Sequence, residues 1–175
     1  MKNKYQTIVL GGGCFWCMEA VFNTLDGIIG VTAGYAGGFT RDPIYGEVCT
    51  GTTGHAEVIS IEYDPGKISL DDILEVFFLT HDPTTPNQQG ADVGSQYRSI
   101  ILYASEEQKE KVVAFIDVIR GNYDTPVVTE VKPLEHFYTA EENHQRYYEM
   151  NQNLPYCRLV ISPKLDKLRK KNLVS

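Results

Sequence analysis

Hydrophobic and polar residues follow patterns along the chain that predict a series of short strands and helices. Apolar residues concentrate in the segment 6–10, and polarity alternates over 56–63, as in strands with a buried face. The predicted strands cover 6–10, 30–35, 56–63, 98–104 and 127–132, and the predicted helices cover 16–25, 69–81, 105–120, a short segment from 139 and a last one from 162.

Polar residues mark where several of these helices begin. Ser69 with Asp72 resembles a capping box, in which two side chains satisfy the backbone N–H groups at the start of a helix. Thr139 with Glu142 is expected to open a short helix in the same way. Pro163 fits the first turn of the last helix, where its missing N–H costs nothing.

The order of the elements predicts an α+β fold. Up to the last helix from 162, the elements follow the order β-α-β-β-α-β-α-β-α, which describes a two-layer sandwich with helices packed on a mixed sheet. The expected topology is a ferredoxin-like core with a split βαβ unit. No repeat or linker divides the chain, so we expect one catalytic domain over 1–161 and a basic, helical C-terminal tail over 162–175.

Composition and charge narrow the classes of function. The 175 residues carry a net charge of −7, which argues against a general nucleic-acid surface. The tail from Ser162 carries +4, and its basic run at 167–171 is interpreted as a solvated helix face. No stretch has the length of a transmembrane helix, the N-terminus lacks an apolar signal region, and four cysteines are too few for a disulfide scaffold. We therefore expect a cytoplasmic protein without a membrane partner, and a monomer.

One long loop and the number of tyrosines point to a binding site. Residues 36–54 are expected to lack regular structure, and loops of this length in compact domains usually carry function. Eleven tyrosines are many for this length. A cluster of tyrosines can line a pocket with hydroxyl donors as well as pack a core.

A triple glycine at residues 11–13 leads directly to Cys14. Because a strand ends and a helix begins here, Cys14 lies at or near the first helical turn, where free N–H groups and the helix dipole stabilise an anion. We therefore expect a reactive thiolate whose sulfur is a nucleophile. The alternative is a buried core thiol that follows a glycine turn.

Glu57 is a carboxylic acid on an apolar face. In the predicted strand it shares its face with Ile59, Ile61 and Tyr63. Burial disfavours the charged carboxylate and raises its pKa, so Glu57 can stay protonated near neutral pH and act as a general acid. The alternative is a glutamate at the sheet edge that reaches solvent. A nucleophilic thiol together with a protonated acid suits the removal of oxygen from a substrate.

With these residues placed, the chain resembles the A-type peptide methionine sulfoxide reductases. The matching motifs are Gly-Cys-Phe-Trp at 13–16, Gly-Tyr-Ala-Gly-Gly at 34–38, Pro-Ile-Tyr-Gly-Glu-Val-Cys at 43–49, Gly-His-Ala-Glu at 54–57, His-Asp-Pro at 81–83, Gln-Tyr-Arg at 96–98 and Glu-Asn-His-Gln at 142–145. They run in the family's order over nearly the whole predicted domain, and as a set they are highly specific.

The resemblance implies thiol-dependent reduction of methionine S-sulfoxide, in proteins and in free form, as a repair of oxidative damage. Cys14 would attack the sulfoxide sulfur while Glu57 gives a proton to the departing oxygen. This step leaves a sulfenic acid on Cys14. Tyr45 and Tyr97 match the tyrosines that hold the sulfoxide oxygen.

The resemblance also implies a substrate pocket and partners. Phe15 and Trp16 match the aromatic pocket for the S-methyl group, and Asp92 matches an acidic residue that positions the substrate. Without the resemblance, Tyr45, Tyr97 and Asp92 would be interpreted as packing or turn residues. The implied partners are oxidised proteins or peptides and thioredoxin as the reductant. No cofactor is implied, because the electrons come through thiols.

The thiol that resolves the sulfenic acid is open. Cys157 follows the last motif, where many family members carry a resolving cysteine, and it is preferred here. Cys17 is the rival because it forms a C-x-x-C with Cys14, although it could point into the core. An external thiol is a third option. Cys49 is interpreted as structural.

Other functions compete with this interpretation. The C-x-x-C supports a thioredoxin-like dithiol oxidoreductase that uses Cys14 and Cys17. A zinc site built from the four cysteines lacks a second close ligand pair, and a cysteine hydrolase lacks a histidine singled out by spacing. His55 and His144 are interpreted as structural.

Overall fold

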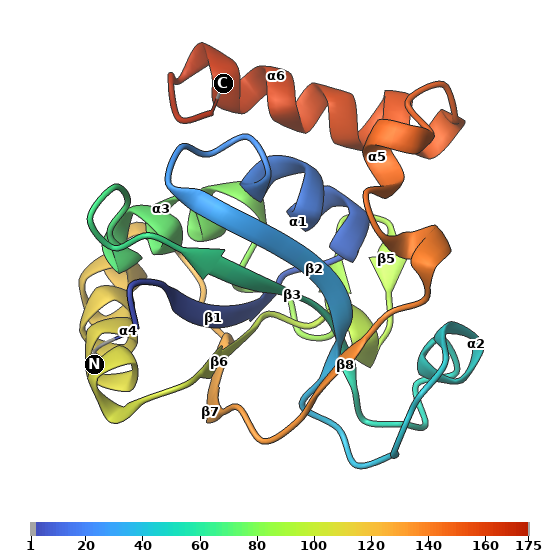
Figure 1. Cartoon of the computed structure of the whole chain (residues 1–175), viewed down its shortest axis with the longest axis horizontal. Coiled ribbons are helices and arrows are strands. Elements are labelled where there is room, and N and C mark those ends of the chain that lie inside the picture. Colours follow the sequence, from blue (N-terminus) through green and yellow to red (C-terminus); the bar gives the residue numbers. More distant parts are fainter. Residues whose placement is uncertain (1–2, 175) are drawn as a thin grey trace.

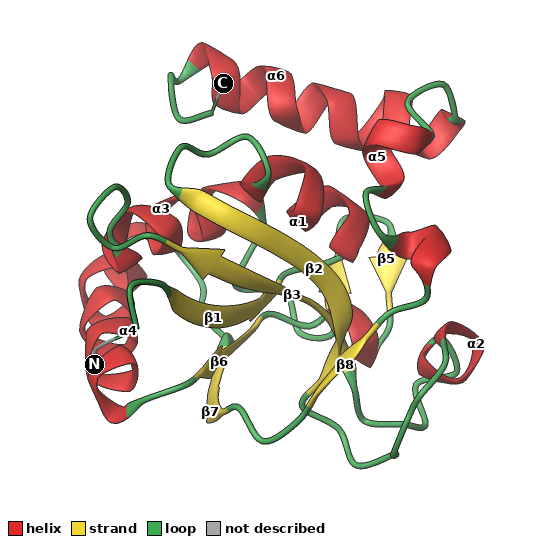
Figure 2. Ribbon diagram, in the orientation of Figure 1, coloured by secondary structure: helices red, strands yellow, loops and turns green. Residues whose placement is uncertain are grey.

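A twisted six-stranded sheet forms the centre of the protein, and helices pack against one of its faces (Figures 1 and 2). The computed structural model describes residues 3–174. The strand order is β7-β6-β1-β3-β2-β8. The strands are β1 (Gln6–Gly11), β2 (Ile28–Ala36), β3 (Ala56–Tyr63), β6 (Ile100–Tyr103), β7 (Glu130–Pro133) and β8 (Phe137–Thr139).

Strand pairing makes this a mixed sheet. β3 is antiparallel to both β1 and β2, so β1 and β2 run parallel to each other with β3 between them. β6 is antiparallel to β1 and parallel to β7. The predicted α+β fold, with helices on a mixed sheet, is confirmed.

The helices differ in length and position. They are α1 (Phe15–Phe22), α2 (Tyr45–Val48), α3 (Leu70–Thr80), α4 (Glu106–Ile119), α5 (Tyr147–Met150) and α6 (Ser162–Lys170). A turn of π-helix at Cys157–Ile161 leads into α6, which forms an outer cover beyond α1 (Figure 1). None of the described helices is long and apolar enough to cross a membrane.

The alternating strand residues supply two apolar layers. Ile8 of β1 and Ile59 of β3 point to the helical side and are fully buried in the main core, together with Phe22 of α1 and Ile73 of α3. Burial of one such side chain contributes about 1.5–3 kcal/mol. The opposite face carries Val9 and a smaller cluster. The position of Glu57 on the helical side of β3 therefore places its carboxyl in the main core.

The capping chemistry predicted for Ser69 is confirmed. Its hydroxyl accepts the Asp72 N–H at 3.1 Å, and the Asp72 carboxylate accepts the Ser69 N–H at 3.0 Å. The capping prediction for Thr139 is wrong, because Thr139 ends β8 and pairs with Gly34 of β2. A short 3₁₀ segment still follows at Glu142–His144.

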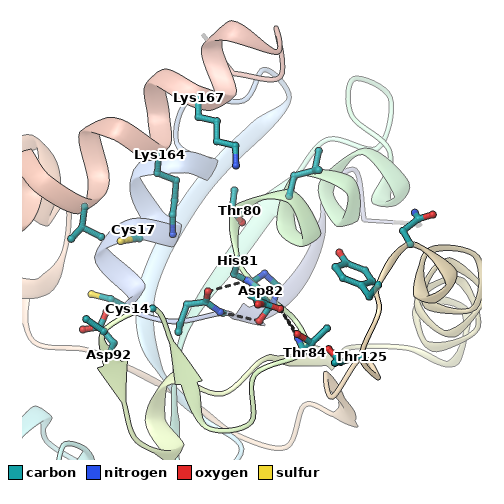
Figure 3. Close-up of a pocket in the computed structure, with 18 of the residues that line it drawn as sticks. Cys14, Cys17, Thr80, His81, Asp82, Thr84, Asp92, Thr125, Lys164 and Lys167 are labelled. Atoms are coloured by element: carbon teal, nitrogen blue, oxygen red, sulfur yellow. Dashed lines mark hydrogen bonds between the residues drawn. The ribbon is translucent and has the colours of Figure 1, made fainter.

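The loop expected to be irregular contains some regular structure, because α2 lies within 36–54. The segment before β6, which lies outside the predicted helices and strands, holds a hairpin of β4 (Gln88–Gln89) and β5 (Asp92–Val93). This hairpin brings Asp92 toward the start of α1, where the candidate site lies (Figure 3).

Candidate active site

The turn before α1 requires glycine, because side chains at these positions would clash or strain the backbone. Gly13 has φ +96°, a left-handed conformation that favours glycine, and a Cβ at Gly12 would lie 2.9 Å from the ring of His81. The turn places Cys14 at the N-cap of α1, where its backbone carbonyl accepts the Cys17 N–H at 3.1 Å. The Cys14 side chain is only 7% exposed.

Glu57 lies directly beside this helix start. Its carboxylate accepts the backbone N–H of Phe15, the residue after Cys14, at 3.1 Å. Glu57 is 1% exposed, and burial raises its pKa to about 8. The Phe15 N–H opposes this rise, whereas the negative charge of Asp92 adds to it. The carboxyl is thus mostly protonated at neutral pH, as its place on the apolar face predicts.

The two cysteines of the C-x-x-C have opposite acidities. Burial raises the pKa of the Cys14 thiol well above its ordinary value, and the hydrogen bond to Cys17 and the charge of Glu57 raise it further. A hydrogen bond from Cys14 lowers the pKa of Cys17 to about 7. The prediction that Cys14 is a thiolate is therefore wrong for the free protein. Cys14 is a protonated thiol, because the effect of burial on its pKa outweighs the field of the helix N-terminus.

Aromatic rings enclose the other side of the helix start. Phe15 is fully buried and packs against the rings of Trp16, Tyr45 and His144. The Trp16 indole stacks on Tyr147 with ring centroids 3.7 Å apart, and its N–H donates to His144 Nδ1 at 3.1 Å. These contacts fix Trp16 in one orientation, so Phe15 and Trp16 form one rigid apolar wall.

The two predicted tyrosines lie close enough to the buried carboxyl for its charge to act on their hydroxyls. Burial raises the pKa of both the Tyr45 and the Tyr97 hydroxyl, and the charge of Glu57 contributes to each shift. Both hydroxyls therefore keep their protons and act as hydrogen-bond donors at neutral pH. Tyr45 is held in place by its backbone N–H, which donates to Glu141 Oε2 at 3.1 Å.

A pocket of about 860 Å³ opens beside the sulfurs (Figure 3). Cys14, Cys17 and Asp92 line one end of it, and Lys164 and Lys167 enter from α6. The walls of this pocket are mixed polar and apolar, whereas the wall formed by Phe15 and Trp16 is aromatic. Cys14 thus lies between an apolar surface and an open pocket of mixed polarity.

The structure brings Cys17, and not Cys157, to this pocket. Cys17 lines it beside Cys14, although its side chain is 3% exposed. Cys157 is fully buried in the π-helical turn, and burial raises its pKa. Cys49 is exposed at the end of α2. Over residues 3–174, no group of three or more metal-ligating side chains is arranged to hold a metal ion.

Two residues at the site were not identified from the sequence. The Tyr156 hydroxyl donates to Asp92 Oδ2 at 2.8 Å and lies 3.6 Å from the Cys17 sulfur. Lys164 of α6 lines the same pocket. The high tyrosine count indicates a hydroxyl-lined pocket, but no local pattern marks Tyr156 or singles out Lys164 among the basic residues of the tail.

The histidines near the motifs have structural partners. His55 Nδ1 accepts the Gly38 N–H at 3.0 Å, and its other ring nitrogen lies 2.7 Å from the Thr40 carbonyl. A Cβ at Gly38 would lie 2.3 Å from the backbone nitrogen of His55, so this glycine permits the close approach of the two backbone segments. His55 therefore braces the glycine-rich loop that follows β2.

Sequence and structure comparisons agree on one family. The family model described as "Peptide methionine sulfoxide reductase" matches residues 6–175. The chain is 55% identical over 165 residues to "Peptide methionine sulfoxide reductase MsrA" of Natronomonas pharaonis, with 93% of each chain covered. A protein of the same name from Nautilia profundicola is 55% identical over 162 residues, also with 93% of each chain covered.

Solved structures give the same result. Reduced Mxr1 from Saccharomyces cerevisiae superposes with a TM-score of 0.85 at 33% identity, over 90% of this chain and 91% of that one. Methionine sulfoxide reductase A of Corynebacterium diphtheriae gives 0.84 at 32% identity, over 89% and 80%. Mxr1 in complex with Trx2 gives 0.62 at 26% identity, over 84% and 87%.

Proposed function

Because the chain belongs to the peptide methionine sulfoxide reductase family, we propose that Cys14 and Glu57 together perform its reduction of methionine sulfoxide. The protein is an oxidoreductase that acts on methionine sulfoxide in peptides, and this reduction of methionine sulfoxide is linked to thioredoxin. The dithiol oxidoreductase alternative is not favoured by this family. The observation that carries the proposal is the buried Glu57 carboxyl, held by the Phe15 N–H beside Cys14.

The first step transfers one oxygen atom and two electrons. Glu57 gives its proton to the sulfoxide oxygen, which makes the methionine sulfur electrophilic. The Cys14 sulfur attacks that sulfur and passes its own proton to the Glu57 carboxylate, so no free thiolate is needed beforehand. The attack forms a bond between the two sulfurs. The hydroxyl then moves to the Cys14 sulfur as the sulfur–sulfur bond and the substrate's sulfur–oxygen bond break, so Cys14 ends as a sulfenic acid and methionine leaves. Glu57 finishes the step protonated.

The surrounding residues orient the sulfoxide. Phe15 and Trp16 form the apolar wall for the methyl group, which excludes water from that side. Tyr45 and Tyr97 donate hydrogen bonds to the oxygen as negative charge develops on it. Asp92 holds the substrate from the pocket side. A fixed wall for the methyl group and fixed donors for the oxygen favour one configuration at sulfur, and the family resemblance implies that this is the S epimer.

Cys17 is the resolving thiol in this proposal. It lies beside Cys14 and its pKa of about 7 makes it the more acidic thiol of the pair. Its attack on the Cys14 sulfenic acid gives a disulfide and water, and the dithiol of thioredoxin reduces the disulfide by exchange. Cys157, preferred from the sequence, would first have to leave a fully buried position.

The remaining assignments concern fold type and location. The strand order β6-β1-β3-β2 with helices α1 and α3 supports a ferredoxin-like core. Catalysis through free thiols supports a cytoplasmic location, where thiols are kept reduced. A monomer stays the prediction made from the sequence.

Incubation with each epimer of a peptide methionine sulfoxide tests the proposed function. With dithiothreitol present, the S epimer is expected to be reduced and the R epimer to remain, because fixed partners for methyl and oxygen favour one configuration and the family resemblance implies the S one. Chromatography of the peptides gives the result. Reduction of both epimers would contradict the proposed pocket, and reduction of neither would contradict the proposed reaction.

A Cys17→Ser substitution tests the resolving step. One equivalent of methionine is still expected from the reduced variant, since Cys14 is intact, whereas turnover with thioredoxin is expected to fall more than about tenfold because no disulfide forms. Dithiothreitol is expected to support turnover by reducing the sulfenic acid directly. Cys157→Ser is the matched control. A Cys14–Cys157 disulfide found by mass spectrometry in Cys17→Ser would overturn the assignment.

A further inference from the structure

We propose that Lys164 of α6 and Tyr156 hold Cys17 as the thiolate that attacks oxidised Cys14, so that the C-terminal segment serves the resolving step. This inference rests on the proposed role of Cys17. Both are positioning residues, because they act through Cys17 and need not touch the substrate. Neither belongs to the motifs that carry the family resemblance.

Lys164 faces Cys17 across one end of the pocket. Both residues line it, and the Lys164 side chain extends from α6 toward the two sulfurs (Figure 3). Lys164 is half-buried, whereas Lys170 on the same helix is exposed. A partly buried ammonium stabilises a neighbouring anion more strongly than an exposed one, since solvent screens it less. After the hydrogen bond from Cys14, the charge of Lys164 contributes to the lowered pKa of Cys17.

Tyr156 connects the resolving thiol to the substrate side of the site. Its hydroxyl lies 3.6 Å from the Cys17 sulfur and donates to Asp92 at 2.8 Å. A hydroxyl has one proton, so it can donate to Asp92 or to a Cys17 thiolate, but not to both. Rotation of this proton from Asp92 to Cys17 stabilises the thiolate in the resolving step, after methionine has left.

The charges around Cys17 oppose one another. Asp92 raises its pKa, whereas Lys164 and the Tyr156 hydroxyl lower it. Glu57 is mostly protonated at neutral pH and adds little negative charge there. The titratable and charged groups that face Cys17 are Cys14, Glu57, Asp92, Tyr156, Cys157 and Lys164. Lys164 is the cation in this set, so its charge is the one that favours the thiolate.

Lys164 and Tyr156 assist the step that forms the disulfide between Cys17 and Cys14. The Cys17 thiolate attacks the sulfur of the Cys14 sulfenic acid, a sulfur–sulfur bond forms, and the sulfur–oxygen bond breaks. The departing hydroxide takes the proton of the Glu57 carboxyl and leaves as water, and Glu57 regains a proton from solvent. Cys14 is reduced from the sulfenic level and Cys17 is oxidised from thiolate to disulfide. No other reactant is required.

Lys164→Gln tests the proposal in a single turnover. The reduced enzyme is mixed with one equivalent of the S-sulfoxide peptide, and methionine release and disulfide formation are followed separately by chemical quench and mass spectrometry. Disulfide formation is expected to slow about fivefold at pH 7, as follows from a rise of about one unit in the pKa of Cys17. The midpoint of its pH profile is expected to move upward, and the rate of methionine release to stay the same.

Matched variants separate charge from structure. Lys164→Arg keeps the charge and is expected to restore the disulfide rate, and Lys170→Gln removes an exposed charge from the same helix and is expected to behave as wild type. Tyr156→Phe is expected to slow disulfide formation as well. An unchanged pH midpoint in Lys164→Gln overturns the inference. Disulfide formation that survives Cys17→Ser overturns instead the role of Cys17, so the two failures are distinguishable.

Discussion

Replacement of Cys14 by serine is expected to abolish sulfoxide reduction, with a loss of more than about 10³-fold in turnover. A serine hydroxyl fits the same N-cap position, but its oxygen cannot accept an oxygen atom and two oxidising equivalents as sulfur does. The assay is reduction of the S-sulfoxide peptide with dithiothreitol, which bypasses the resolving thiol. Circular dichroism is expected to show an unchanged fold, because the substitution alters one atom in a pocket wall.

The control for this prediction is Cys49→Ser. Cys49 lies on the surface after α2, and the serine hydroxyl keeps a hydrogen-bonding partner for Tyr45. This variant is expected to retain activity, which rules out a general effect of losing a thiol. Substantial turnover by Cys14→Ser would contradict the assignment and would move the nucleophile to Cys17, the neighbouring sulfur in the same pocket.

Local sequence patterns determined much of the fold but not its edges. The strand predicted over 56–63 matches β3, because alternation directly reflects which side chains face the core. β8 has only three residues and no such pattern, and it forms because β2 offers an edge at Gly34. A Cβ at Gly34 would lie 2.3 Å from the Phe137 ring, a contact between segments that no local pattern encodes.

The contrast between local patterns and contacts of distant segments also explains which features of the site could be predicted. The glycine turn and the strand face placed Cys14 and Glu57 correctly in the structure, because both depend on neighbours in sequence. The acidity of Cys14 could not be predicted that way. It is set by how deeply the thiol is buried, and the walls of its pocket come from distant segments, among them Tyr156 and α6. Helix-terminus fields are a local effect, whereas desolvation is a property of the whole fold.

Replacement of Glu57 by glutamine is expected to lower the rate of sulfoxide reduction about 10²–10⁴-fold, the range for loss of a general acid. The amide can still accept the Phe15 N–H, so Cys14 and the aromatic wall keep their places. It has no acidic proton for the sulfoxide oxygen and cannot take the proton of the Cys14 thiol. In a single turnover with excess enzyme, the slow step is expected to be methionine release, whereas substrate binding stays near that of wild type.

The raised pKa of Glu57 also predicts how stability depends on pH. The pKa rises from 4.5 to about 8 on folding, so the folded state binds the proton more tightly than the unfolded chain does. The stabilisation from this proton is fully present below pH 4.5 and is lost as pH rises through about 8. The free energy of unfolding of wild type, measured in urea, is therefore expected to fall over this interval relative to Glu57→Gln, which has no such proton. The wild-type rate of methionine release is expected to fall above about pH 8, in step with ionisation of the same group. Equal pH slopes of stability in the two proteins would show that Glu57 is already ionised in the folded state and cannot be the acid.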